Sequence, residues 1–385
     1  MENIKINSLG PIQEANINFG DLTLFVGPQA SGKSILLQLI KLLVDKRSIR
    51  RTIEQYGFIW SNNEEEILDR YFGEGMGGIW TKETSVNFDG KTYKLDYLKP
   101  KQNESYKDAE DQLFYIPAQR VICLQNGWPR YFTEYEDAVP YILRDFSETL
   151  RQFLESGLGI KEGSLFPQNQ RLKQPFRDSI NNSIFHNGKI VIDRTNKKRL
   201  KLNVGNSSLP FMAWSAGQKE FMPLLLSFYY LCPSSKASRT EGIKYVIIEE
   251  PEMGLHPQAI QSVLLQILDL LSRDYKVIVS THSPVLLEFA WAFNILKTAN
   301  ATGKELLDLF DLKNSAPLKK LFGDQLKNKK INTYYFDRGT DQVNIRDISS
   351  LDAGSEDLAV SEWGGLSSFS SKATNLISNI AANYG

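Results

Sequence analysis

The sequence has 385 residues, of which 42% are hydrophobic and 23% charged, which excludes a mostly disordered chain. Lys plus Arg and Asp plus Glu both number 45, so the formal net charge is zero and does not indicate a nucleic-acid binder. Two cysteines, Cys123 and Cys232, are too few for a disulfide framework or a cysteine metal site, so we expect a reduced, cytoplasmic protein. No secretory signal pattern is found, and the longest apolar run, 223–232, is about half of a membrane span, so we expect no membrane partner.

The first predicted elements are short strands and one helix. Alternating residues predict strands at 4–6 and 15–19, and a compact apolar run predicts a buried strand at 21–26. A glycine-containing loop follows, and then a helix over 35–44. The order strand, glycine loop, helix is typical of a phosphate-binding fold.

The rest of the chain divides into a β-rich middle and an α/β second half. The middle segment, 46–210, predicts a hairpin at Asp89-Gly90, a second between 189–193 and 200–204, and an amphipathic helix over 137–158 interrupted by Pro140. The second half predicts helices and strands in alternation, with helices over 218–231, 258–272 and 284–293 and strands over 244–248 and 275–280. The tail predicts strands over 332–336 and 342–348 and an amphipathic helix over 371–382.

The sharpest motif is the segment 27–34, GPQASGKS, which fits G-x-x-x-x-G-K-[ST]. Its glycines let backbone N–H groups turn inward around phosphate oxygens at the positive end of the following helix. Lys33 is expected to reach the β- and γ-phosphates, and Ser34 to ligate Mg²⁺. We therefore expect ATP to be bound by the whole segment, namely Gly27, Pro28, Gln29, Ala30, Ser31, Gly32, Lys33 and Ser34.

A second motif is the segment 245–257, YVIIEEPEMGLHP, in which an apolar strand ends in two acids. In P-loop folds such a strand end presents carboxylates to Mg²⁺ and to water. Glu249 is expected at the metal, usually through water, and Glu250 is expected to orient or deprotonate the attacking water. The alternative is an acidic strand-to-helix loop without a catalytic role.

Two further segments carry weaker signals. His282 follows the predicted strand 275–280, where a histidine can hydrogen-bond the γ-phosphate, although a solitary histidine is more often structural. Ser215 can cap the helix that follows it, and the N–H groups at such a helix start suit a phosphate. A capped helix with no function would look the same. The candidate phosphate contacts at this helix start are Ser215, Ala216, Gly217 and Gln218.

In this order the four motifs resemble the ATP-binding-cassette ATPases of the RecF, SMC and OLD group, over residues 1–45 and 200–295. SAGQKE resembles the group's signature motif, EEPEMGLHP its Walker B and D-loop, and STHSP its His switch. The resemblance implies an α/β P-loop NTPase of ABC-ATPase type with a β-rich lobe and a helical insertion. The implied division is an ATPase core of 1–45 and 200–300, a lobe and insertion of 46–199, and an α/β extension of 301–385.

The finer resemblance is to the OLD branch. The metal-side acid is Glu249 where many cassette ATPases have Asp, and the segment YIPAQR also resembles that branch, which places Gln119 or Arg120 near the nucleotide. The resemblance implies a homodimer closed face to face around ATP and released by hydrolysis through Glu250, with a larger oligomer left open. After His282 we find no Asp-x-Asp pair on an apolar strand, and about 100 residues are too few for a Toprim nuclease domain plus the tail.

The tail, residues 363–381, resembles the ATPase subunit of PARIS-type two-component antiphage systems. That resemblance implies a separate Toprim nuclease effector and a phage-encoded trigger protein. A different functional class stays open, namely a RecF/SMC-like DNA-repair ATPase that clamps DNA. Net charge zero argues mildly against it, and the basic runs 46–51 and 197–199 are more often solvated than DNA-binding. A transporter subunit is disfavoured by the Glu-Glu-Pro-Glu motif and by the large insertion.

Overall fold

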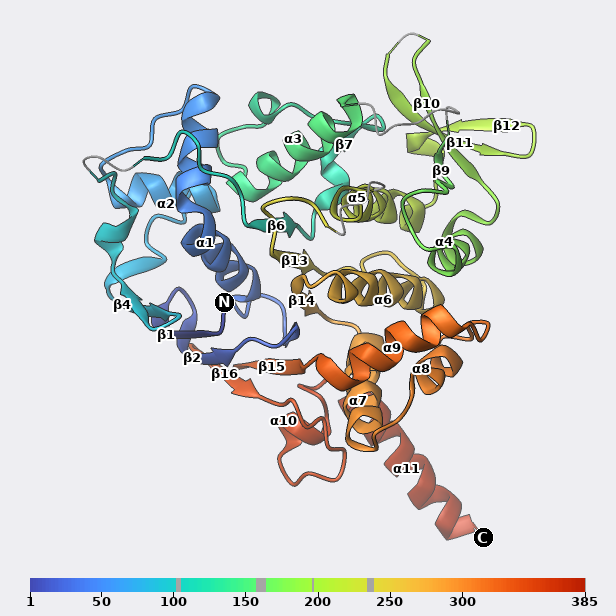
Figure 1. Ribbon diagram of the computed structural model, residues 1–385. Helices are drawn as coiled ribbons and strands as arrows, with labels where there is room; N and C mark the ends of the chain where they lie inside the picture. The colour runs from blue at the N-terminus through green and yellow to red at the C-terminus, as the bar shows by residue number, and fades with distance from the viewer. Residues whose placement is uncertain (102–104, 157–163, 196, 234–238, 385) are drawn as a thin grey trace. The chain divides into compact units, whose positions relative to one another are not determined.

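The computed structural model describes residues 1–101, 105–156, 164–195, 197–233 and 239–384. These residues form two compact units, each of which is described by itself (Figure 1). Unit 1 consists of Met1–Ser34, Thr81–Lys94 and Ile278–Gly385, and unit 2 of Ile35–Trp80 and Leu95–Val277. The hairpin at Asp89-Gly90 belongs to the sheet of unit 1.

Unit 1 is built on a mixed sheet with the order β5-β4-β1-β2-β16-β15-β3-β14. The buried strand β3 pairs in parallel with β15, so Phe25 lies opposite Tyr334, and the first two strands form the predicted antiparallel hairpin. Strands from both ends of the chain therefore lie side by side. The strands of unit 1 are β1 (Asn3–Leu9), β2 (Ile12–Asn18), β3 (Leu22–Val26), β4 (Trp80–Phe88), β5 (Lys91–Tyr93), β14 (Lys276–Thr281, from residue 278 on), β15 (Ile331–Arg338) and β16 (Val343–Asp347).

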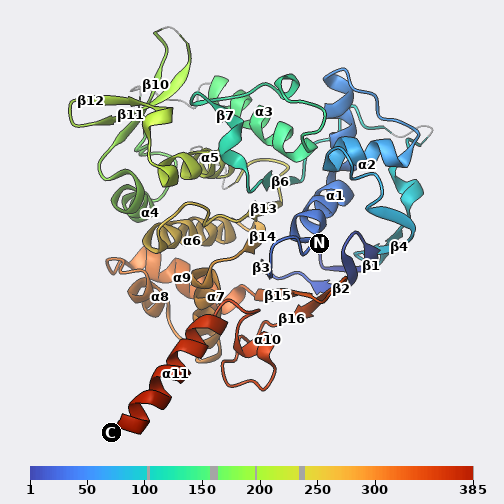
Figure 2. The same cartoon turned by 180° about the vertical axis from the view of Figure 1, so that it is seen from behind.

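The helices of unit 1 follow β14, apart from the first two residues of α1. Most begin at a Ser, Thr or Asp whose side chain accepts a backbone N–H, as Ser283 does from Val285 at 3.2 Å. The last helix leaves the sheet (Figures 1 and 2) and exposes Phe369, Leu376 and Ile377. These helices are α7 (Pro284–Thr298), α8 (Gly303–Leu309), α9 (Ala316–Asn328), α10 (Leu358–Ser361) and α11 (Ser368–Tyr384).

Unit 2 is organised around the parallel pair β6 (Leu113–Ile116) and β13 (Tyr245–Glu249). The long helix α1 (Lys33–Gln55) is kinked at Asp45, whose φ is −120° and ψ is 17°. The Asp45 carboxylate accepts the backbone N–H groups of Gln112 and Leu113 at 2.9 and 3.0 Å, and Lys41 pairs with it at 2.9 Å. The kink thus joins α1 to the start of β6 through a buried ion pair.

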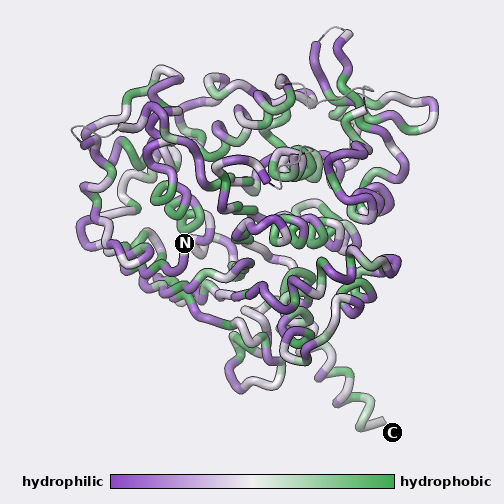
Figure 3. The backbone as a smooth tube through the Cα atoms, in the orientation of Figure 1, coloured by the Kyte–Doolittle hydropathy of each residue, from purple (hydrophilic) through white to green (hydrophobic). Residues whose placement is uncertain are grey.

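The other elements of unit 2 are helices and a second, four-stranded sheet of order β12-β11-β10-β9. The helix α6 is apolar along most of its length, as the green of Figure 3 shows, and its leucines are buried. The helices are α2 (Glu64–Phe72), α3 (Tyr141–Glu155), α4 (Gln174–Ile180), α5 (Ala216–Leu231) and α6 (Pro257–Ser272). The strands are β7 (Leu124–Gln125), β8 (Trp128–Pro129), β9 (Ser164–Phe166), β10 (Lys189–Asp193), β11 (Arg199–Val204) and β12 (Ser207–Pro210), and short turns of helix lie at η1 (Leu95–Leu98), η2 (Arg120–Cys123), η3 (Phe132–Glu134), η4 (Asn181–Phe185) and η5 (Phe211–Ala213).

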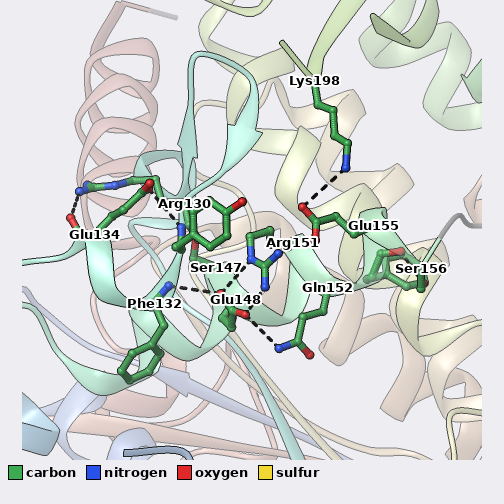
Figure 4. Close-up of polar contacts among 12 residues, drawn as sticks. Arg130, Phe132, Glu134, Ser147, Glu148, Arg151, Gln152, Glu155, Ser156 and Lys198 are labelled. Carbon is green, nitrogen blue, oxygen red and sulfur yellow. Dashed lines mark hydrogen bonds and ion pairs between the residues drawn. The ribbon is translucent and has the colours of Figure 1, made fainter. Parts of the chain in front are cut away.

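A row of charged side chains fixes α3 in unit 2 (Figure 4). Glu148 accepts the backbone N–H of Phe132 at 3.2 Å and is paired with Arg151. Arg151 also pairs with Glu155, which lies 3.8 Å from Lys198 in the turn between β10 and β11. Although burial disfavours the charge, hydrogen bonds from Arg151 and from other neighbours lower the pKa of Glu148 to about 2.

The predicted strands and helices are present with shifted ends. The helix expected over 137–158 begins at Tyr141, because Pro140 occupies the N-cap, and it ends at Glu155, while residues 157 and 158 lie outside the described residues. The helix expected over 35–44 continues to Gln55. Among the elements that the sequence analysis missed are β6, α2, α8 and α9. Within the described ranges, no helix combines the length and the apolar character needed to cross a bilayer.

Candidate functional site

The glycine loop of unit 1 lies at the end of β3, directly before α1. Gly27 has φ +149°, and a Cβ there would come within 2.8 Å of the Cβ and 2.9 Å of the carbonyl oxygen of Phe336 on β15. Gly32 has φ +86°, and a Cβ there would lie 3.0 Å from Pro11. Only glycine satisfies both the conformation and the space at these two positions.

Lys33 folds back into the loop that precedes it. Its ammonium donates to the carbonyl oxygens of Gly27 and Pro28, both at 2.8 Å, and to the Ser31 hydroxyl at 3.3 Å. The side chain is 6% exposed. Ser34 follows it on the first turn of α1 and is exposed. The loop therefore surrounds a positive charge at the N-terminal, positive end of a helix, an arrangement that favours anions.

A residue that the sequence analysis missed braces this loop. Arg338, the last residue of β15, donates to the carbonyl oxygens of Gln29 and Ala30 at 3.1 and 3.3 Å. Ala30 has φ +55°, so it is held in a conformation that is uncommon for residues with a Cβ. The only sequence signal was a basic residue at the end of a predicted strand, and nothing linked it to a loop near the N-terminus.

His282 lies between β14 and α7, as predicted. The strand ends at Thr281, whose hydroxyl accepts the backbone N–H of Ser283 at 2.9 Å, and Ser283 caps α7. His282 is half-buried at this tight turn. Since β14 and β3 are neighbours in the sheet, His282 and Gly27 follow adjacent strands of unit 1.

The acid pair lies in unit 2, at the end of β13. Glu249 is 4% exposed, and its Oε2 accepts the backbone N–H of Ala118 at 3.2 Å. Burial and the nearby Glu249 raise the pKa of the Tyr115 phenol well above its usual value. Glu250 follows with φ +41°, a left-handed conformation that turns the chain sharply after the strand.

The resemblance left Gln119 and Arg120 as alternatives near the nucleotide, and the two side chains have different surroundings. Gln119 is exposed, whereas Arg120 is fully buried. The Arg120 guanidinium donates to the carbonyl oxygens of Glu249 at 3.1 Å and of Glu250 at 3.2 Å. Its Nε donates to the carbonyl oxygen of Glu220 on α5, at 3.1 Å. Arg120 therefore contacts the backbone around the acid pair.

The predicted cap at the start of α5 is confirmed. The Ser215 hydroxyl accepts the N–H of Gln218 at 3.3 Å, and the Gln218 side chain accepts the N–H of Ser215 at 3.2 Å. Gly217, the second residue of the helix, lies so close to the turn after β13 that a Cβ would be 2.9 Å from the carbonyl oxygen of Gly254. The structure thus brings together the acid pair, Arg120 and the start of α5 within unit 2.

Two of the predicted metal-site residues carry oxygen donors, Ser34 in unit 1 and Glu249 in unit 2. Ser34 offers a hydroxyl oxygen and Glu249 a carboxylate, the ligand types that Mg²⁺ prefers. In the part of the chain that the structure describes, no group of three or more His, Cys, Asp or Glu residues could hold a metal by itself.

Two family models match the sequence. The model described as "AAA domain, putative AbiEii toxin, Type IV TA system" matches residues 91–288, which is more than half of the chain. The chain belongs to this AAA family. A second model, described as "AAA ATPase domain", matches residues 1–139 and includes the glycine loop. No curated protein matches the sequence. The expected α/β fold class and the ATPase type of domain are thereby confirmed.

Solved structures give low-scoring similarities to this AAA chain. An SMC head bound to the C-winged helix domain of ScpA is 11% identical, with 90% of this chain and 96% of that chain covered and a TM-score of 0.42. The SMC head domain from Thermotoga maritima is 11% identical, with 90% and 98% covered and a TM-score of 0.35. The ATP-binding cassette MJ0796, in a dimeric post-hydrolysis state bound to ADP and Pi, is 13% identical, with 73% and 88% covered and a TM-score of 0.30.

Proposed function

We propose that this chain is the ATP-binding and ATP-hydrolysing subunit of a cytoplasmic antiphage defence complex. ATP-dependent, head-to-head dimerisation would control the capture and release of a separate effector, a Toprim nuclease, when a phage protein acts as trigger. The observation that carries the ATPase part is the loop that holds Lys33 against the carbonyl oxygens of Gly27 and Pro28 at 2.8 Å. The match to an AAA ATPase model over residues 1–139 supports the same assignment.

The predicted site residues would have different roles in ATP binding and hydrolysis, according to their chemistry. Lys33 and the N–H groups of the loop bind the β- and γ-phosphates, and Ser34 and Glu249 hold Mg²⁺. Bound Mg²⁺ neutralises charge on the phosphate oxygens. Glu250, next to the metal-side acid, orients the attacking water and accepts its proton, and His282 donates a hydrogen bond to the γ-phosphate.

Dimerisation would use the start of α5. In that helix the capping box accepts the N–H groups of Ser215 and Gln218, while the N–H groups of Ala216 and Gly217 belong to the first turn, which has no intrahelical acceptors. These groups suit the γ-phosphate of ATP held by a second copy. The γ-phosphate would then shift the population toward the closed dimer.

The defence role rests on the resemblance of the tail and on the family description, which names a toxin of a toxin–antitoxin system, a two-component arrangement. The alternative, a DNA-clamping repair ATPase, is less supported. In the basic run 46–51, Lys46 is buried, donates to the Lys99 carbonyl oxygen and lies over Tyr97. Arg50 of that run pairs with Glu54. Two cations of the run are therefore used inside the protein, whereas Arg47 of this run is exposed, as are Lys197 and Lys198 of the run 197–199.

The first experiment uses Glu250→Gln. This variant should bind ATP, hydrolyse it poorly and accumulate as the closed dimer, and ATPase rates equal to the wild type would disprove the role of Glu250. Affinity purification of the variant from its native host with ATP, read by mass spectrometry, then tests the complex. A stoichiometric nuclease encoded nearby supports the defence function, whereas chromosomal DNA with repair proteins and no dedicated effector supports the DNA clamp.

A further inference from the structure

Arg120 lies between two elements that the proposed function uses separately. Its Nε donates to the carbonyl oxygen of Glu220 on α5, and its Nη atoms donate to the carbonyl oxygens of Glu249 and Glu250. Weaker contacts reach the carbonyl oxygens of Ala118 and Pro251 at 3.4 and 3.5 Å. One rigid, planar group thus connects the start of α5 to the turn after β13.

The guanidinium is suited to this place by its geometry and its charge. Five N–H donors in a fixed, planar fork can bond several carbonyl oxygens at once, in a geometry that the three donors of an ammonium group on a flexible stem do not reproduce. Burial lowers the pKa of Arg120, and the acids Glu220 and Glu252 raise it. A guanidinium keeps its charge in proteins, and the hydrogen bonds of Arg120 go to main-chain oxygens.

The backbone conformation of Glu250 indicates what the contact with Arg120 does. With φ +41°, Glu250 is in a backbone conformation that residues with a Cβ rarely adopt, and such conformations persist where the surroundings impose them. Arg120 donates twice to the carbonyl oxygen of this residue, at 3.2 Å. The same turn touches α5 a second time, because Gly254 lies against Gly217.

We propose that Arg120 is a positioning residue that couples the start of α5 to Glu250. When a second copy binds the start of α5, this coupling sets the direction of the Glu250 side chain. This inference rests on the proposed function for the role of Glu250. It assigns no contact with nucleotide to Arg120 itself, because the guanidinium is used on the backbone of its own unit.

The first test is kinetic and compares Arg120→Lys with Arg144→Lys. Arg144 is a matched control because it is also buried, at 3% exposed, and also donates to main-chain oxygens. These are the carbonyl oxygens of Val139 and Glu136, at 3.0 and 2.7 Å, which lie outside the motifs. We expect Arg120→Lys to lower kcat at least 10-fold while the Kd of a fluorescent ATP analogue changes less than 3-fold. Arg144→Lys should change both by less than 2-fold. Equal losses of kcat in the two variants would reduce Arg120 to a structural residue and overturn the proposal.

The second test does not depend on hydrolysis. In the turn after β13, the N–H groups of Met253 and Leu255 bond to the carbonyl oxygens of Glu250 and Glu252 at 3.1 and 2.9 Å, so their hydrogen exchange reports on this turn. Ser215→Ala removes the cap of α5 and should raise the exchange of these amides at least 3-fold in the wild-type background. In the Arg120→Lys background, Ser215→Ala should raise the exchange of these amides less than 1.5-fold.

The two tests separate the inference from the function on which it rests. A wild-type protein that binds ATP without hydrolysing it would disprove the proposed ATPase, and the exchange experiment would still decide the coupling. An equal effect of Ser215→Ala in both backgrounds would refute the coupling even if the ATPase is active, because a double-mutant cycle then shows no interaction.

Discussion

The guanidinium of Arg338 donates to the carbonyl oxygen of Gln29 at 3.1 Å, across a separation of 309 residues. The contact exists because β15 runs parallel to β3, with Tyr335 opposite Val26, so both strands lead toward the glycine loop. A side chain from the C-terminal part of the chain thus orients carbonyl groups of the predicted phosphate site.

We predict that Arg338→Gln raises the KM for ATP about 2- to 5-fold and leaves kcat within 2-fold. The contact is exposed and holds the loop rather than a phosphate, so its loss should weaken binding modestly. Steady-state ATPase assays measure both constants. Arg346→Gln is the control, since Arg346 is a half-buried arginine of β16 that pairs with Asp337 on β15 and with Asp357 at the start of α10. A matching rise of KM in the control would show that loss of any arginine here has this effect.

Gly217→Ala should slow ATP hydrolysis about 10-fold with little change in ATP affinity. The new Cβ would lie 2.9 Å from the Gly254 carbonyl oxygen, so the helix start and the turn after the acid pair must separate. Single-turnover hydrolysis and nucleotide titration distinguish the two effects. Gly78→Ala in the same unit is the control, because no atom lies within 4 Å of its added Cβ. Unchanged hydrolysis in Gly217→Ala would contradict the role assigned to this contact.

Gly27→Ala should destabilise unit 1 by more than about 2 kcal/mol and abolish ATP binding, because φ +149° is unfavourable for alanine and its Cβ would meet the main chain of Phe336. Chemical denaturation and nucleotide titration measure the two losses. Gly339→Ala, whose Cβ would lie 3.5 Å from the nearest atom, should cost less than about 0.5 kcal/mol. Retention of ATP binding by Gly27→Ala would show that the loop can adopt another conformation.

A stability measurement tests the buried charges around α1. Burial and the neighbouring Asp111 raise the pKa of Asp145 to about 7, while Lys41 opposes the shift. The pKa of Asp145 in the folded state exceeds its unfolded value of about 3.9, so protonation of Asp145 stabilises the folded state. This contribution to the free energy of unfolding is complete below pH 4 and is lost as the pH rises toward 7. Asp145→Asn should therefore be more stable than the wild type by about 1–3 kcal/mol at pH 8, with the difference shrinking toward pH 4.

Thermal unfolding between pH 4 and 8 checks this pH dependence. Asparagine keeps an acceptor for the Tyr141 hydroxyl, which donates to Asp145 at 2.9 Å, so the comparison isolates the charge. A difference that stays constant over the whole range would show that the carboxyl of Asp145 does not titrate between the two states in this window.

Local patterns allowed much of the fold and the motif positions to be predicted. The buried strand before Gly27, the cap at Ser215 and the strand ending at Glu249 each depend on neighbouring residues, and each is present. The contacts of Arg120 and Arg338 could not be predicted, because they depend on pairings between strands that are far apart in the sequence. The strand β6 was missed because only four residues, 113–116, form it.

The order of the strands in unit 1 has a consequence for synthesis of the chain. The strand β3, which leads into the glycine loop, has β14 on one side and β15 on the other, and β16 lies between β15 and β2. Gly27 is packed against Phe336. The loop thus leaves the ribosome about 300 residues before its supporting strands β15 and β16 are translated. Nascent chains that stop before residue 336 should therefore lack a formed nucleotide site, so that ATP binding becomes available only after β15 has been translated.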